Sequence, residues 1–414
     1  MPVIKIPEFI TKILLCFRLN FSKPQFENFQ TYITGLVINL EARNIQDIAD
    51  YNLTYEKDQS SLNRSLTESP WDDNELQKLS YEILKEENLK KIKQNDNRPI
   101  CFLIFDDIVI EKYGKNIEGA GWFYSNKEHK DVWGINVFSA LVVVENLPFP
   151  MLLKNEQYYK KEYCEENKIE FKTKIQMSKE VVEKFKGFEG YHIIVLADSW
   201  YPEKGLINLI RERSYDWCFA LRSNRKTYNK KGKKIKLSHL AKSLNFSNYK
   251  KYEIGERIFW ATSRVIVLPE IGTARLVLSK EQTKGKKKKD IKKANIKFIA
   301  TSLDYLTVKQ ILQIYSFRTK IENAFKDMKL HLGLGDCQMI IREGIKKHLS
   351  CVQAVYNFVY TVALTRGIEK EVKTIGEICL YIQKQFLISA LNYCYELGKL
   401  NKKVDIEKIL VSNY

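Results

Sequence analysis

The chain has 414 residues, 44% of them hydrophobic, which excludes a disordered protein and allows two or three domains with a sizeable core. Its formal net charge of +18 at pH 7 is typical of proteins that bind a polyanion. No run approaches about 18 consecutive apolar residues, so we expect no transmembrane helix and no membrane partner. The eight cysteines include no CxxC pair, which favours free thiols in a cytoplasmic protein over disulfides or a zinc site.

The first part of the chain, residues 1–95, has the apolar periodicity of helices. Two short helical stretches, 45–51 and 59–66, have the size of a helix-turn-helix, in which Asn63 and Arg64 would contact DNA from the second helix. Many small helical domains contain such a pair without binding DNA. We predict a helical N-terminal DNA-binding domain over 1–95.

From residue 100 the pattern changes to apolar runs of strand length. The run CFLIFDDIVI ends its apolar part in Asp106 and Asp107, and the run HIIVLAD ends in Asp198. Helical segments alternate with the later strands, so we predict a mixed α/β sheet whose first part spans 96–222. Ligands of such sheets collect where strands end, although an acid at a strand end also commonly caps a loop.

A lysine-rich segment, residues 223–305, interrupts this pattern and is predicted to be a β-rich insertion. The predicted strands are 252–260, 263–268, 275–279 and 298–301. Between the last two, the run KGKKKKDIKK is either a flexible solvated loop or a basic clamp on DNA.

A helix predicted within 306–342 carries Tyr315, Arg318, Glu322 and Lys329 at intervals of three, four and seven residues. These intervals place the four side chains within about 60° of one helix face. A carboxylate between two cations suits a metal-bound phosphodiester, although a solvated helix face has the same pattern.

Glu322 would complete a catalytic site by meeting the acids of the two buried strands. Three converging carboxylates repel one another unless cations neutralise them, which implies two divalent metal ions. Oxygen-only ligands favour Mg²⁺, and two such ions can activate an attacking oxygen and stabilise a leaving oxygen during phosphoryl transfer.

The segment YSFRTKIENAFKDMK, from Tyr315 to Lys329, has the spacing Y-x2-R-x3-E-x6-K. With the strand acids, it resembles the DDE transposases of bacterial insertion sequences, over roughly residues 95–365. The resemblance implies an α/β fold: a ribonuclease-H-like mixed sheet core interrupted by a β-rich insertion, with the catalytic helix completing the core over 306–342. A helical N-terminal domain and a helical C-terminal region, 343–414, would flank it.

The resemblance also implies roles for single residues. Asp107, Asp198 and Glu322 would be catalytic and hold two Mg²⁺ ions, for which Mn²⁺ can substitute. The first acid of the family commonly stands in a D-D-T, where this chain has Asp106, Asp107 and Ile108. The acid directly before the usual Thr is the ligand in similar proteins, which favours Asp107, with Asp106 as the alternative on the opposite face of the strand.

Further residues would contact DNA. Tyr315, Arg318 and Lys329 match family positions that contact phosphates at the transposon end, which suits a hydroxyl donor, a bidentate guanidinium and an ammonium. Some relatives stack a flipped base on an aromatic residue of the insertion, and Trp260 is the candidate here. A Trp in a β sheet is more often part of the core.

The implied activity is that of a DNA transposase. It would bind the inverted-repeat ends of its own element, cleave them by metal-dependent hydrolysis and join the 3′-hydroxyl to target DNA. Two ends must be held at once, so we expect a homodimer on double-stranded DNA, in the cytoplasm and associated with the nucleoid. Two alternatives stay open: a decayed or domesticated copy that binds DNA without cutting it, which Ile108 favours, and a ribonuclease-H-like host nuclease.

Overall fold

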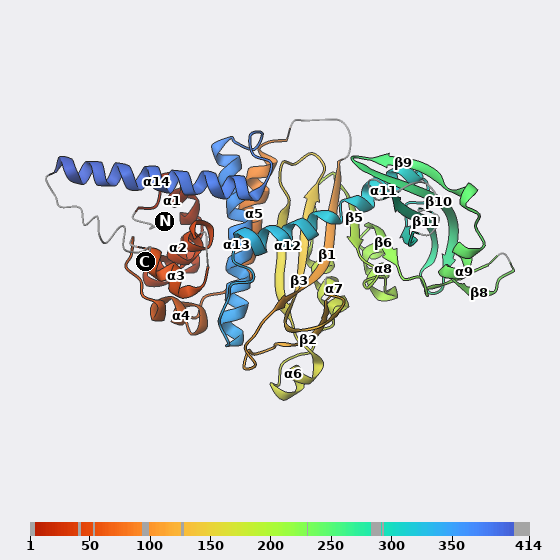
Figure 1. Cartoon of the computed structure of the whole chain (residues 1–414), viewed down its shortest axis with the longest axis horizontal. Helices are drawn as coiled ribbons and strands as arrows, with labels where there is room; N and C mark the ends of the chain where they lie inside the picture. The colour runs from red at the N-terminus through yellow and green to blue at the C-terminus, as the bar shows by residue number, and fades with distance from the viewer. Residues whose placement is uncertain are drawn as a thin grey trace.

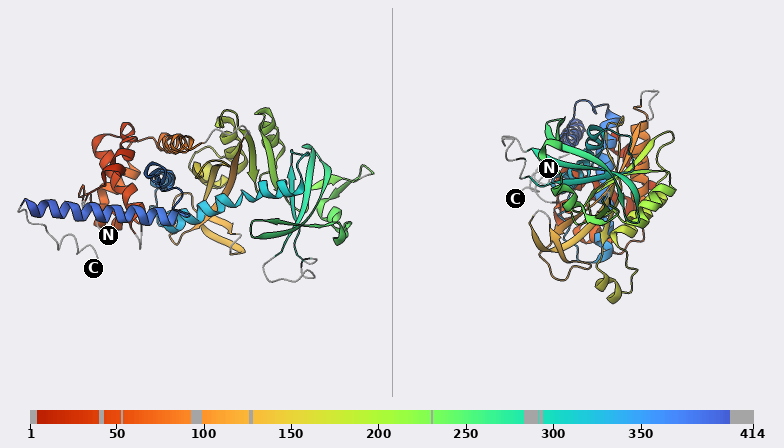
Figure 2. Two further views of the ribbon diagram at one scale, coloured as in Figure 1. Left: turned by 90° about the horizontal axis from the view of Figure 1, so that it is seen from above. Right: turned by 90° about the vertical axis from the view of Figure 1, so that its right-hand side faces the viewer.

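The computed structural model describes residues 5–39, 43–52, 54–92, 99–125, 128–229, 231–282, 291 and 294–400. The described chain is elongated (Figure 1), with α1 to α4 and α14 at one end, a sheet in the middle and the strands β9 to β11 at the other end. Figure 2 shows the same order from above, with α11 and α12 linking the last two parts. The predicted run KGKKKKDIKK lies outside the described residues, except for Ile291.

The helices are α1 (Glu8–Leu15), α2 (Lys23–Ile38), α3 (Ile45–Tyr51), α4 (Gln59–Thr67), α5 (Asp73–Leu89), α6 (Lys161–Glu166), α7 (Lys174–Lys184), α8 (Lys204–Glu212), α9 (Leu237–Lys242), α11 (Val308–Ser316), α12 (Thr319–His331), α13 (Arg342–Arg366) and α14 (Ile375–Lys399). The strands are β1 (Ile100–Glu111), β2 (Gly121–Ser125), β3 (Lys130–Val144), β4 (Met151–Tyr158), β5 (His192–Ala197), β6 (Asp216–Leu221), β7 (Lys226–Tyr228), β8 (Lys234–Lys236), β9 (Lys250–Ile254), β10 (Arg257–Leu268), β11 (Gly272–Gln282) and β12 (Lys297–Thr301).

Ten of the described strands form one mixed sheet, in the order β2-β3-β1-β5-β6-β12-β11-β10-β9, with β4 also pairing with β3. Strand β1 pairs antiparallel with β3 and parallel with β5, and β6 continues the parallel part. This arrangement, with its helical N-terminal region and helical tail, confirms the predicted fold class, a ribonuclease-H-like α/β core. Strand β12 pairs with β6, so the strands of the insertion continue the sheet of the core.

The sequence pattern predicted that β1 would end at its acids, but the strand continues beyond them. Its parallel pairing with β5 stops at Ile104, but its antiparallel pairing with β3 continues to Glu111. Asp106 and Asp107 therefore lie inside β1, just beyond the last residue that pairs with β5. The apolar run in the sequence is shorter than the strand, because the side chains beyond the end of β5 are less buried. The backbone stays extended there because β3 still pairs with it.

Two other elements differ from their predictions. The predicted strand over 252–260 is a hairpin, β9 and β10, whose turn contains Gly255 in the left-handed region, at φ 57°. The predicted catalytic helix is two helices, α11 and α12, separated at Phe317 and Arg318. A capping box of Thr307 and Gln310 starts α11, whereas no side chain caps the start of α12.

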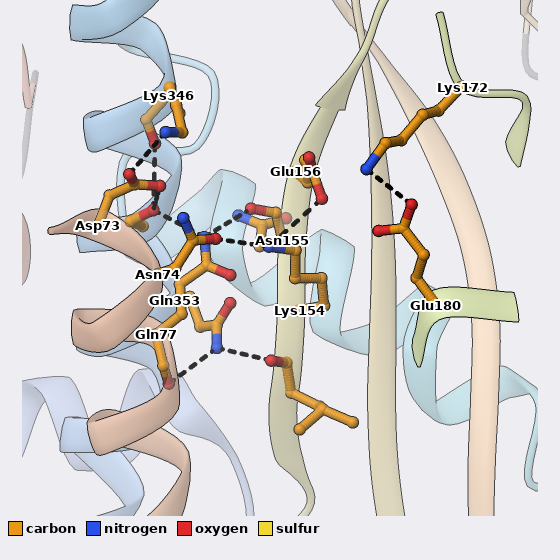
Figure 3. Close-up of polar contacts among 12 residues, drawn as sticks. Asp73, Asn74, Gln77, Lys154, Asn155, Glu156, Lys172, Glu180, Lys346 and Gln353 are labelled. Carbon is orange, nitrogen blue, oxygen red and sulfur yellow. Dashed lines mark hydrogen bonds and ion pairs between the residues drawn. The ribbon is translucent and has the colours of Figure 1, made fainter. Parts of the chain in front are cut away.

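Helix α13 packs against both α5 and the outer strand β4. Because β4 pairs only with β3, its other edge would leave peptide groups unpaired. Amide side chains occupy that edge instead (Figure 3): Gln353 donates to the carbonyls of Leu152 and Leu153, and Gln77 donates to the carbonyl of Asn155. The helices are thereby held in a fixed register on the sheet.

Candidate active site

Asp106 faces the α12 side of the sheet. Its Oδ2 lies 2.7 Å from Nη1 of Arg318, and Nη2 of the same guanidinium lies 2.7 Å from Oε1 of Glu322. One arginine therefore bridges the strand acid and the helix acid. The pKa of Asp106 is raised to about 7, chiefly by burial; the positive charge of Arg318 opposes this rise, and the negative charges of Asp198 and Asp107 add to it.

Asp198 follows directly after β5, as predicted, and its Oδ1 accepts a hydrogen bond from the backbone N–H of Trp200 at 2.8 Å. Its charge acts on Asp106 and on Arg318, which places it in the same electrostatic cluster. The pKa of Arg318 is raised: burial opposes its charge, but Asp106, Tyr315 and Glu322 favour it. Arg318 thus stays fully charged among these acids.

Asp107 has different partners. Its Oδ2 accepts hydrogen bonds from Nζ of Lys174, at 2.6 Å, and from Nδ2 of Asn136, at 2.8 Å. Lys174 begins α7, and its ammonium lies 5.1 Å from the centre of the Tyr158 ring. Because side chains alternate along a strand, Asp107 is directed to this group and Asp106 to Arg318.

Buried Tyr201 lies close to all three strand acids. Burial and then the carboxylates of Asp107, Asp106 and Asp198 hold its pKa well above the ordinary value. A neutral hydroxyl at this place can donate a hydrogen bond to an acid without adding charge to the cluster.

The four residues of the Y-x2-R-x3-E-x6-K spacing, which were predicted to share one helix face, are spread over two helices. Tyr315 is buried in α11, and the ammonium of Lys297 from β12 lies 5.1 Å from its ring centre. Lys329 in α12 donates to the backbone carbonyl of Val109 at 3.2 Å. Tyr315 and Lys329 therefore flank Glu322 and Arg318 along α11 and α12, which cross the sheet in front of β1 (Figure 1).

Trp260 packs against Phe246, with ring centres 5.3 Å apart, and its Nε1 donates to Oε1 of Gln282. The more accessible aromatic residue near the acids is Trp200, which is 57% exposed. The guanidinium of Arg222 covers one face of its ring at 4.5 Å.

The chemistry of this cluster suits a hard divalent cation, because Asp106 and Glu322 already share one cationic group and Asp198 lies beside them. Within the described part of the chain, no three acidic, histidine or cysteine side chains are close enough together to hold a metal ion as they stand. The carboxylates would have to close around an ion.

The partners of the acids were not predicted from the sequence. Lys174 and Asn136 come from α7 and β3, and no spacing in the sequence links them to Asp107. The Arg318–Glu322 pair could have been predicted from the sequence, because side chains four residues apart lie next to each other on a helix. That Arg318 would also reach Asp106 depends on how α12 lies across β1.

Comparison with known proteins gives two family matches. The model described as DDE superfamily endonuclease matches residues 16–236, more than half of the chain, and the model described as Transposase DDE domain matches residues 173–358. The first match contains Asp106 and Asp198, and the second contains Asp198 and Glu322.

A curated relative, a probable transposase for insertion sequence element IS701 from Microchaete diplosiphon, is 28% identical over 201 residues. The aligned region is 48% of this chain and 50% of that protein, so the chain spans about half the length of this relative. None of the described helices is long and apolar enough to cross a membrane. From the family match over more than half its length, the chain belongs to the DDE superfamily of endonucleases, which includes the insertion-sequence transposases that its sequence resembles.

Proposed function

We propose that the protein is a DNA transposase that binds the inverted-repeat ends of its insertion sequence, cleaves them by metal-dependent hydrolysis and joins the freed 3′-hydroxyl to target DNA. The observation that carries the proposal is the group of Asp106, Asp198 and Glu322 around Arg318, at the point where β1 loses its parallel partner. Membership of the DDE superfamily supports it.

We propose Asp106, rather than Asp107, as the first metal ligand. Asp106 shares Arg318 with Glu322 and interacts electrostatically with Asp198, whereas Asp107 is neutralised by Lys174. Asp107 would then be a positioning residue that ties the start of α7 to β1. Two Mg²⁺ ions, held by Asp106, Asp198 and Glu322, would polarise the scissile phosphate and the attacking oxygen when bound.

The residues around these acids would hold the DNA. Tyr315, Arg318 and Lys329 would contact phosphates of the terminal nucleotides, because they lie on both sides of Glu322. For base stacking, Trp200 is a better candidate than Trp260, since its ring is exposed beside Asp198.

We also propose a division of the chain: DNA binding by residues 1–95, catalysis by 96–222 and 306–342, an insertion over 223–305 that faces the DNA end, and a helical region over 343–414. The exposed position of Asn63 and Arg64 on α4 agrees with a role in DNA contact. Holding two element ends requires a homodimer in the DNA complex.

Cleavage of a labelled duplex that carries the terminal repeat found beside the gene tests the proposal. The experiment compares the wild type with Glu322→Gln in Mg²⁺. Glu343→Gln is the matched control, because Glu343 is also a partly exposed helical glutamate paired with a cation four residues away. We expect a cut at the element boundary with the wild type and the control, and none with Glu322→Gln.

Binding without cutting by all three proteins would favour the decayed copy and contradict the proposal. Equal cutting of duplexes with and without the terminal repeat would instead favour a host nuclease.

A further inference from the structure

Arg318 has two ion pairs that its proposed role in DNA binding would require it to give up. Its Nη1 contacts Asp106 and its Nη2 contacts Glu322, both at 2.7 Å, and its side chain is 16% exposed. A guanidinium held by a carboxylate at each terminal nitrogen has its charge compensated and its orientation fixed, so it is poorly placed to bind a phosphate as well.

The same two carboxylates are needed by a divalent cation. A metal ion bound between Asp106 and Glu322 would need the position that the Arg318 guanidinium occupies. Two cations at one position repel each other, so the facing oxygens of the two acids cannot hold both. Arg318 therefore competes with the metal in the arrangement described here.

A second cationic side chain lies beside Tyr315, the residue one helical turn before Arg318. Lys297 stands there, with its Nζ 5.1 Å from the centre of the Tyr315 ring. Burial lowers the pKa of Lys297, and the positive charge of Arg318 lowers it further, so the two cations repel each other. A phosphate between them would remove this repulsion and draw Arg318 away from the acids.

We propose that Arg318 couples DNA binding to metal binding: without DNA its guanidinium occupies the place between Asp106 and Glu322, and a DNA phosphate near Lys297 draws it away and opens the acids to a divalent cation. This inference rests on the proposed function. By linkage, the phosphate and the metal then each raise the affinity for the other.

The test measures Mn²⁺ binding by electron paramagnetic resonance, without DNA and at about pH 8, where free carboxyl groups are ionised. It compares the wild type with Arg318→Gln. The control is Arg366→Gln, which removes the same charge from an exposed site at the end of α13. We expect Arg318→Gln to bind Mn²⁺ about tenfold more tightly, within the usual range of coupling between sites, and the control to bind like the wild type.

Unchanged or weaker Mn²⁺ binding by folded Arg318→Gln would overturn the coupling. The double variant Asp106→Asn, Arg318→Gln separates this failure from failure of the site itself. If the added Asp106→Asn change leaves Mn²⁺ binding as tight as in Arg318→Gln, Asp106 does not hold the metal and the metal site of the proposed function also fails.

A second measurement needs no substitution. A crystal structure of the wild type with Mn²⁺ should show the guanidinium of Arg318 released from at least one carboxylate. A metal ion on Asp106 and Glu322, with both ion pairs to Arg318 intact, would overturn the inference.

Discussion

At the scale of single residues, two neighbouring acids on one strand have different environments. Asp106 is directed to Arg318 and Asp107 to Lys174, although both follow the same apolar run. The sequence predicted that the two would face opposite ways, but it could not tell which face would meet α12. That choice depends on the side of β1 on which α12 packs, which spacing alone does not determine.

A buried histidine gives a prediction for pH. His348 in α13 lies against Tyr32, with Nδ1 2.8 Å from the hydroxyl oxygen, and burial, followed by the charge of Lys112, lowers its pKa to about 3. In the unfolded chain a histidine has a pKa of about 6.5. Between these values the folded state binds fewer protons than the unfolded state, so acidification destabilises the fold.

We predict that His348→Gln removes this part of the acid sensitivity. The free energy of unfolding should fall less between about pH 7 and about pH 4.5 than in the wild type, by up to roughly 1.4 kcal/mol per pH unit. Urea titrations at both pH values measure it. The exposed His129 provides the control variant His129→Gln, which should behave like the wild type, and identical pH slopes for all three proteins would contradict the prediction.

At the scale of elements, the strands and helices were easier to predict than their limits. Continuous apolar runs predicted β1 and β5, because both are buried on two faces. The hairpin of β9 and β10 was missed, because its strands follow each other with only a short turn at Gly255. The break between α11 and α12 was also missed, since Phe317 and Arg318 are ordinary helical residues in sequence.

The covered edge of β4 gives a prediction for stability. The fully buried side chain of Asn357 accepts a hydrogen bond from the N–H of Leu152 and donates one to the carbonyl of the same residue. In Asn357→Leu the N–H of Leu152 would be left unpaired in the core. We expect a loss of about 1–3 kcal/mol in the free energy of unfolding, measured by urea titration.

Thr361→Val is the control for this change. Thr361 is one turn further along α13, and its hydroxyl donates only to the carbonyl of Asn357 within the helix. The control should lose clearly less stability than Asn357→Leu. Equal losses would show that the side-chain bonds to β4 contribute little.

At the scale of the whole molecule, the elongated shape brings helices, sheet and insertion into one row, with α11 and α12 spanning the last two (Figures 1 and 2). Net charge indicated a polyanionic partner, and the four-residue signature indicated the family, but neither could place the insertion. Its position follows from the pairing of β12 with β6, a contact between residues about 80 apart in the chain.

The basic composition predicts DNA binding that weakens steeply with salt. The logarithm of the affinity should fall linearly with the logarithm of the salt concentration, by about 0.9 for each phosphate contact. Lys329→Gln should make this slope less steep by about one. Lys399→Gln, which changes a lysine paired with Glu396 at the far end of α14, should leave the slope unchanged. A wild-type slope in Lys329→Gln would show that Lys329 does not contact a phosphate.

The measurement that tests the central claim most directly is cleavage of the element end in Mg²⁺ by Asp106→Asn and by Asp107→Asn. Loss of a metal ligand removes several kcal/mol of transition-state stabilisation, so we predict a loss on the order of a hundred- to a thousandfold or more for Asp106→Asn. Asp107→Asn should stay within about tenfold of the wild type, because it weakens the contacts with Lys174 and Asn136 but leaves the proposed metal ligands in place. Loss of cleavage in Asp107→Asn with activity retained in Asp106→Asn, while both variants still bind DNA, would contradict the account.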